Sequence, residues 1–228
     1  MAPKILFILT SHNKLGNLDK PTGWYLPELA HPYHVLHNKA EITVASPKGG
    51  ESPLDPSSVE AAKDDVSVNF LKNNESVWKT TQKLDEFLGK ASEFDAIFYV
   101  GGHGPMYDLA DSPTSQQLIR EFWEAGKIVS AVCHAPAVLY NVKLSDGSLL
   151  VAGREVTAFT NTEEEQVGLT EVVPFLPEDA LQKASGGHFV KAAEPWAEKV
   201  AVSGRLITGQ NPASATAVGE AIAKALGI

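Results

Sequence analysis

Near the middle of the chain, residues 127–139 have the sequence "KIVSAVCHAPAVL". Its first half is apolar and β-branched, as in a buried strand, and its second half is a run of small and apolar residues typical of a helix. Cys133 stands between the two halves, directly before His134, and is the only cysteine of the protein. The stretch therefore predicts a strand that turns straight into a helix, with a thiol at the turn.

Other apolar runs share this strand character, namely residues 5–10, 41–46 and 96–102. Candidate helices lie between and after them. Residues 112–126 begin with an expected N-cap at Ser112, followed by proline, and residues 211–228 repeat the pattern with Asn211. Near-continuous apolar strands joined by helices indicate an α/β fold, a doubly wound, mainly parallel sheet with helices on both faces.

Two shorter segments predict hairpins added to this sheet. One covers residues 150–159 with its turn at Gly153-Arg154, and the other covers residues 201–209 with its turn at Ser203-Gly204. No repeat or long linker interrupts the chain, so residues 1–228 are expected to form a single domain. Within it, residues 47–92 are expected to be the least regular and a peripheral part.

Composition excludes several classes of partner. The chain has 228 residues, 43% of them hydrophobic, and a formal net charge of −9, which argues against nucleic acid. The apolar run in "MAPKILFILTSH" is too short for a signal peptide or a membrane span. A lone cysteine forms no internal disulfide, so we expect a cytoplasmic protein. From the charge and the short apolar run, we expect no nucleic-acid and no membrane partner.

Cys133 lies where a doubly wound sheet binds its ligands, beyond the carboxyl ends of the strands. Helix N–H groups at such a turn are expected to lower the thiol pKa, and the backbone N–H groups of His134 and Gly102 are candidates to hold an oxyanion. The alternative is a small buried apolar side chain, which is common for intracellular cysteines. The adjacent His134, a candidate general base, favours the nucleophile.

Two groups of carboxylates are candidates to support this pair. One of the three in "EEE", residues 163–165, is expected to orient His134, and the others to form a solvated helix start. Glu28 lies among apolar residues in "GWYLPELAHPY". It either caps the first turn of a helix or is a buried acid, with a raised pKa, that donates a hydrogen bond to the thiolate.

The combined motifs "IVSAVCHAPAVL", "GGHGPMYDL", "TAFTNTEEE", "LITGQNPAS" and "GWYLPELAHPY" resemble the DJ-1/PfpI superfamily, in particular its class of heat-shock-protein-31-like glyoxalase III. The resemblance implies a flavodoxin-like fold and a homodimer. It implies a glutathione-independent glyoxalase (D-lactate dehydratase, a lyase) that turns methylglyoxal into D-lactate without metal or other cofactor. The site residues implied are Cys133, His134, Glu164 and Glu28, with Glu163 or Glu165 left open in place of Glu164.

Other functions are compatible with parts of the sequence. A stress-response holdase chaperone, a redox sensor, a cysteine peptidase and a deglycase remain alternatives, and a nuclear location is left open beside the cytoplasmic one. A glutamine amidotransferase needs a late His-x-Glu, whereas His188 is followed by Phe-Val. His31, His34 and His37 drift around a helix instead of sharing one face, so they are a weak zinc motif.

Overall fold

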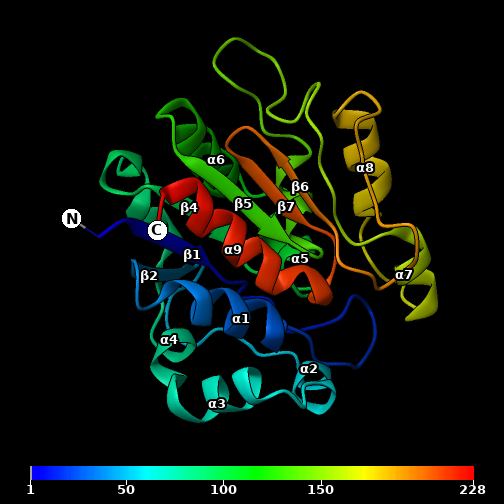
Figure 1. The fold of residues 1–228 in the computed structure, drawn as a ribbon. Coiled ribbons are helices and arrows are strands. Elements are labelled where there is room, and N and C mark those ends of the chain that lie inside the picture. The colour runs from blue at the N-terminus through cyan, green and yellow to red at the C-terminus, as the bar shows by residue number, and fades with distance from the viewer. Residues whose placement is uncertain (1) are drawn as a thin grey trace.

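The computed structural model describes residues 2–228 and contains one seven-stranded sheet (Figure 1). The strand order is β3-β2-β1-β4-β5-β7-β6, and only β6 runs antiparallel to its neighbour. The chain therefore winds outward from β1 in both directions, which confirms the doubly wound α/β sheet. The strands are β1 (Lys4–Ile8), β2 (Glu41–Ser46), β3 (Gln82–Lys83), β4 (Ala96–Tyr99), β5 (Ile128–Val132), β6 (Val200–Ser203) and β7 (Leu206–Gly209).

Helices cover both faces of the sheet because successive strand residues point to opposite sides. In β1, Ile5 and Phe7 belong to the apolar cluster under α1 (Leu26–Leu36) and α9 (Ala215–Leu226). Leu6 and Ile8 belong to the cluster on the other face, under α6 (Pro113–Glu124). Helices α1 and α9 pack side by side across the middle of one face (Figure 1).

Residues 47–92 are more regular than expected. They form three short helices, α2 (Pro56–Ala61), α3 (Asp65–Asn73) and α4 (Glu75–Lys79). The edge strand β3 and a 3-10 turn at Leu84–Phe87 follow. The N-caps of α2 and α3 are Asp55 and Asp64, whose side chains accept backbone N–H groups. The region is also not merely peripheral, because the start of α2 borders the pocket described below.

The two helices predicted at residues 112–126 and 211–228 are present, but only the first has the predicted start. Ser112 caps α6 through a hydrogen bond from the N–H of Ser115, as expected. The C-terminal helix begins later than predicted, because Pro212–Ser214 form a 3-10 turn before α9. Asn211 does not cap it, since its side chain turns instead to Glu163 and to the carbonyl of Ala197.

Two predictions about strands need correction. Residues 150–159 form turns and no hairpin, and Val151 and Val156 are apolar there because they pack into the core. The second hairpin is confirmed as β6 and β7, although its turn falls on Gly204 and Arg205, one residue later than predicted. The runs at 5–10, 96–102 and 128–133 also extend past the observed ends of β1, β4 and β5.

None of the helices within residues 2–228 combines the length and the apolar character that a membrane crossing requires. Three other helices complete the fold near the carboxyl edge of the sheet: α5 (Pro105–Asp108), α7 (Asn161–Gln166) and α8 (Pro177–Ala184).

Candidate active site

The backbone at Cys133 makes a sharp turn directly after β5. Cys133 has φ = +64°, in the left-handed region that side chains other than glycine rarely adopt. Its N–H donates to the carbonyl of Gly209 (2.9 Å), and its carbonyl accepts from the N–H of Phe159 (2.8 Å). A strained residue held on both sides in this way is typical of a nucleophile at a strand-to-helix turn. The helix expected after the turn is present as a short 3-10 helix, Ala135–Leu139.

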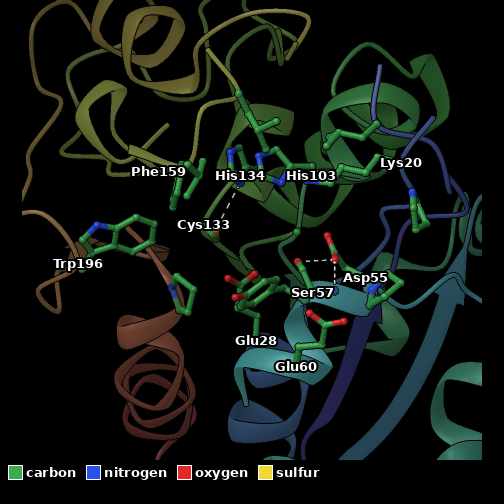
Figure 2. A pocket seen from close by; sticks show the side chains of 18 residues that line it. Lys20, Glu28, Asp55, Ser57, Glu60, His103, Cys133, His134, Phe159 and Trp196 are labelled. Carbon is green, nitrogen blue, oxygen red and sulfur yellow. Dashed lines mark hydrogen bonds between the residues drawn. The ribbon is translucent and has the colours of Figure 1, made fainter. Parts of the chain in front are cut away.

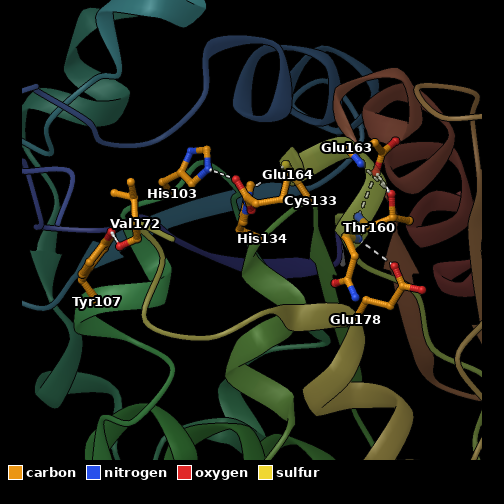
Figure 3. Close-up of polar contacts among 10 residues, drawn as sticks. His103, Tyr107, Cys133, His134, Thr160, Glu163, Glu164, Val172 and Glu178 are labelled. Atoms are coloured by element: carbon orange, nitrogen blue, oxygen red, sulfur yellow. Dashed lines mark hydrogen bonds and ion pairs between the residues drawn. The ribbon is translucent and has the colours of Figure 1, made fainter. Parts of the chain in front are cut away.

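A chain of polar contacts runs from the thiol to a buried carboxylate (Figure 3). The Cys133 Sγ lies 3.4 Å from Nδ1 of His134, and Nε2 of His134 lies 2.5 Å from Oε2 of Glu164. An ionised carboxylate only accepts hydrogen bonds, so the proton of a neutral His134 is assigned to Nε2. Nδ1 is then free to accept a proton from the thiol.

His103 is a member of this cluster that the sequence analysis did not single out. Its Nε2 donates to the other oxygen of Glu164, Oε1, at 2.8 Å, and its ring centre lies 3.9 Å from that of His134. The same carboxylate thus receives one N–H from each of two imidazoles. The signal was the histidine of "GGHGPMYDL", a motif from which only Gly102 was named as a candidate site residue.

The three glutamates at the start of α7 have three different environments. Glu164 contacts His134, as the resemblance implied. Glu163 instead forms a capping box with Thr160 and accepts from the side chains of Gln210 and Asn211 and from the backbone N–H of Trp196. Glu165 is exposed. The structure therefore brings only Glu164 to the imidazole, and Glu163 is buried and not a solvated helix start.

Glu28 approaches the thiol from α1, on the opposite side from His134. Its side chain is fully buried, and neither carboxyl oxygen has a hydrogen-bond partner among residues 2–228, so it does not cap the helix. A Cβ on Gly101 would lie 2.0 Å from Oε2 of Glu28 and 2.8 Å from Cβ of Cys133. Only glycine at position 101 therefore lets this carboxyl group and the turn at Cys133 come together.

Burial disfavours the charged form of each titratable group in this cluster, but the resulting pKa shifts differ between the groups. It raises the pKa of Glu28 well above its ordinary value, against a smaller opposing effect of Cys133. It also raises the pKa of the Cys133 thiol, and a charge on Glu28 would raise it further. This direction is opposite to the lowered thiol pKa that the sequence predicted. In the resting protein, the thiol therefore keeps its proton.

His134 and Glu164 form a pair in which the imidazole is neutral and the carboxylate is negatively charged. Burial and the neighbouring His103 lower the pKa of His134. Burial opposes ionisation of Glu164 as well, but His134 and His103 outweigh it and hold the pKa of this carboxyl well below its usual range. At neutral pH, His134 is uncharged and Glu164 is ionised, which is the state needed for His134 to accept a proton.

Two backbone donors border the thiol. No acceptor within residues 2–228 takes the N–H of Gly102 or of His134, whereas the N–H of Cys133 is already bonded to Gly209. Gly102 has φ = +108°, and a Cβ there would lie 2.3 Å from the carbonyl oxygen of Gly23. The position thus requires glycine, and both N–H groups remain available to a developing oxyanion.

The cluster opens into a pocket of about 440 Å³ whose two sides differ in character (Figure 2). Phe159 and Trp196 lie on one side of Cys133, and Lys20, Asp55 and Ser57 lie on the other. Trp196 is also held in the left-handed region, at φ = +65°, and its ring packs edge-on against Phe159. None of these side chains was assigned to the site from the sequence.

Residues that could hold a metal ion come together once. Among residues 2–228, His103, His134 and Glu164 are the single group of three or more histidine, cysteine or acidic side chains with ligand atoms close enough to share an ion. The weak zinc motif does not form such a group. His31 bonds to Thr216 and Asp64, and His37 bonds to the carbonyl of Tyr33.

Comparisons with known proteins agree over nearly the whole chain. The family model described as DJ-1/PfpI family matches residues 25–225. Glyoxalase 3 from Candida albicans is 30% identical over 228 residues, which cover 95% of each protein. The crystal structure of glyoxalase III from Candida albicans matches with a TM-score of 0.89 at 28% identity, covering 98% of this chain and 97% of that one. Rapid Encystment Protein 24 KDa from Francisella tularensis matches with a TM-score of 0.91 at 37% identity, covering 98% and 99%.

Proposed function

The chain belongs to the DJ-1/PfpI family, and from this premise we propose that it is a glutathione-independent glyoxalase, which converts methylglyoxal to D-lactate through an adduct on Cys133. The observation that carries the proposal is the continuous contact from the Cys133 thiol through His134 to Glu164, with the buried acid Glu28 on the other side. The name of the Candida albicans relative, Glyoxalase 3, supports a glyoxalase activity.

The first step forms a carbon–sulfur bond. Nδ1 of His134 takes the thiol proton as the sulfur attacks the aldehyde carbon of methylglyoxal, and the carbonyl electron pair moves to the oxygen. The N–H groups of Gly102 and His134 stabilise this oxyanion until the imidazole of His134 returns the proton to it, which gives the hemithioacetal and restores the neutral base. Because the thiol pKa is raised, the thiolate forms only together with proton transfer to His134.

The next steps move hydrogen between adjacent carbons. His134 removes the proton from the former aldehyde carbon to give an enediol and returns a proton to the neighbouring carbon, which leaves a thioester and a new hydroxyl group. Water then hydrolyses the thioester, releasing lactate and restoring the thiol. One carbon is oxidised and its neighbour reduced, so the reaction consumes one water and needs no external oxidant or cofactor.

Glu28 has a separate task in this scheme. As a neutral acid, it donates a hydrogen bond to the sulfur when the thiolate forms, and it adds no negative charge beside it. A charged carboxylate at the same place would repel the thiolate. We therefore assign Glu28 to stabilising the nucleophile and Glu164 to orienting the base.

Formation of D-lactate from methylglyoxal tests the proposal. The protein is treated with chelator, freed of glutathione and compared with Cys133→Ala, whose melting temperature is measured to confirm that it is folded. We expect D-lactate from the wild-type protein and a loss of at least about 1000-fold in the variant, because both the nucleophile and the proton relay depend on the thiol. Iodoacetamide should abolish the activity, since Cys133 is the only cysteine.

Absence of lactate from both proteins would contradict the glyoxalase proposal and favour the holdase, redox-sensor, peptidase or deglycase alternatives. L-lactate, or a racemate formed during turnover, would contradict the stereochemical part alone. The homodimer and the cytoplasmic location stay predictions that light scattering and fluorescence microscopy of a tagged protein would check.

A further inference from the structure

Glu164 and its two imidazoles have the composition of a metal site. The ligand atoms of His103, His134 and Glu164 all lie within 4.8 Å of one another. Two histidines and one carboxylate are the protein ligands of many zinc sites that keep one position open. All three side chains are largely buried, and both histidines line the pocket, so the open position would face the pocket (Figure 2).

The spacing of these atoms requires only small shifts to surround an ion. A tetrahedral zinc ion with ligands at about 2.0–2.2 Å holds its ligand atoms about 3.3–3.5 Å apart. The present separations are 2.8 Å between Oε1 of Glu164 and Nε2 of His103, and 2.5 Å between Oε2 of Glu164 and Nε2 of His134. The ion would therefore replace the two hydrogen bonds by three coordinate bonds, one from each side chain, and the three ligand atoms, which lie within 4.8 Å of one another, would adjust to this spacing.

We propose that His103, His134 and Glu164 form an inhibitory binding site for a divalent transition-metal ion of the zinc type. The inhibition follows from the two nitrogens of His134. When the metal takes the electron pair of Nε2, a neutral imidazole carries its proton on Nδ1. Nδ1 faces the Cys133 sulfur at 3.4 Å and then can no longer accept the thiol proton. The metal thus removes the base without touching the nucleophile.

The geometry separates this site from ordinary capture of a metal by a thiolate. The sulfur of Cys133 lies on the Nδ1 side of His134, whereas the three ligand atoms gather on the Nε2 side. Cys133 is therefore not a ligand in this proposal, and His103 is. No metal site was expected from the sequence, because the ligands are spread over residues 103–164 without a recognisable spacing.

Cobalt(II) titration of the chelator-treated protein tests the site through visible absorption. We expect saturable binding with the absorption of tetrahedral cobalt in both the wild-type protein and Cys133→Ser, without a thiolate-to-cobalt charge-transfer band. His103→Phe keeps an aromatic ring but loses the ligand, and its affinity should fall by more than about tenfold, since loss even of outer partners costs about 10- to 100-fold. Melting temperatures confirm that the variants are folded.

Absence of saturable binding, or binding that is lost in Cys133→Ser, would overturn the site. A second assay measures lactate formation against Zn²⁺, each protein relative to its own metal-free rate, and it rests on the proposed function. Zn²⁺ should inhibit the wild-type protein at concentrations at least about tenfold lower than His103→Phe. Equal inhibition of both would overturn the inhibitory role. Cobalt binding without lactate from any protein would reject the glyoxalase proposal and leave the site standing.

Discussion

Two buried glutamates flank the same thiol, and their surroundings drive them to opposite charge states. Glu28 reaches Cys133 from α1 and finds no hydrogen-bond partner for either oxygen among residues 2–228. Glu164 reaches His134 from α7 and receives an N–H on each oxygen. Burial raises the pKa of the first, whereas the two imidazoles hold the pKa of the second well below its usual range.

The difference shows that burial alone does not decide the charge of a carboxyl group. Both side chains have an exposed fraction of 1% or less, so the solvation lost on folding is comparable. What differs is the number of donors aimed at the oxygens. The protein thus favours the neutral form of one glutamate and the charged form of another, on two sides of one nucleophile.

The largest effect is expected from neutralising Glu164. In Glu164→Gln, the side chain no longer carries a charge and can accept from only one of the two imidazoles, so His134 is free to adopt the other tautomer. We expect kcat/KM for lactate formation to fall by about 100-fold or more. The matched control is Glu165→Gln, the exposed neighbour on the same helix, whose activity should stay within about twofold of wild type. Equal losses in the two variants would contradict the assignment.

A smaller effect is expected from Glu28, and two substitutions sharpen the comparison. Glu28→Gln keeps a neutral donor beside the sulfur, whereas Glu28→Leu removes the donor. A hydrogen bond to a charged group contributes about 1.5–3 kcal/mol, so kcat/KM should fall by about 10- to 100-fold in the leucine variant and by less in the glutamine variant. A glutamine variant as impaired as the leucine variant would show that Glu28 acts through its charge.

The stability of the fold should depend on pH in opposite ways at the two sites. The folded pKa of Glu28 is raised, so the unfolded chain releases its proton first, and this glutamate costs stability as pH rises above about 4.3. The folded pKa of Glu164 is lowered, so its contribution is present above about 4.3 and is lost as pH falls below that value.

Urea unfolding from pH 3 to 7 measures this difference. Relative to wild type, Glu28→Gln should gain stability as pH rises, by at most about 1.4 kcal/mol per pH unit, because glutamine has no proton to lose. Glu164→Gln should be less stable than wild type at pH 7, and its deficit should shrink below about pH 4.3. Parallel curves for the two variants would contradict the opposite charge states.

The sequence predicted the frame of the molecule better than the details of its site. Apolar runs identified β1, β4 and β5, because a strand buried on both faces has few polar residues in its pattern. The run of β2 was identified as well, although this strand is only partly buried. The segment 150–159 has similar apolar residues, but they are buried loop side chains such as Val151 and Val156. A short apolar pattern does not distinguish a buried loop from a strand.

Within the site, the sequence predicted the contacts between residues that are neighbours in the chain. Cys133 and His134 are neighbours in the chain, so their contact was open to inference. The choice of Glu164 over Glu163 depends on the orientation of α7, which the capping box at Thr160 sets. The contact of His103 with Glu164 and the unpartnered burial of Glu28 depend on elements far apart in sequence. No local spacing contains that information.

The most direct test of this account is the protonation state of Glu28 at pH 7, measured by infrared difference spectroscopy on the carbonyl stretch of protonated carboxylic acids. We expect a protonated-acid band in the wild-type protein that disappears in Glu28→Gln and persists in Glu164→Gln. Absence of the band from wild type, or its disappearance in Glu164→Gln alone, would contradict the central claim that the neutral acid and the charged carboxylate lie on opposite sides of Cys133.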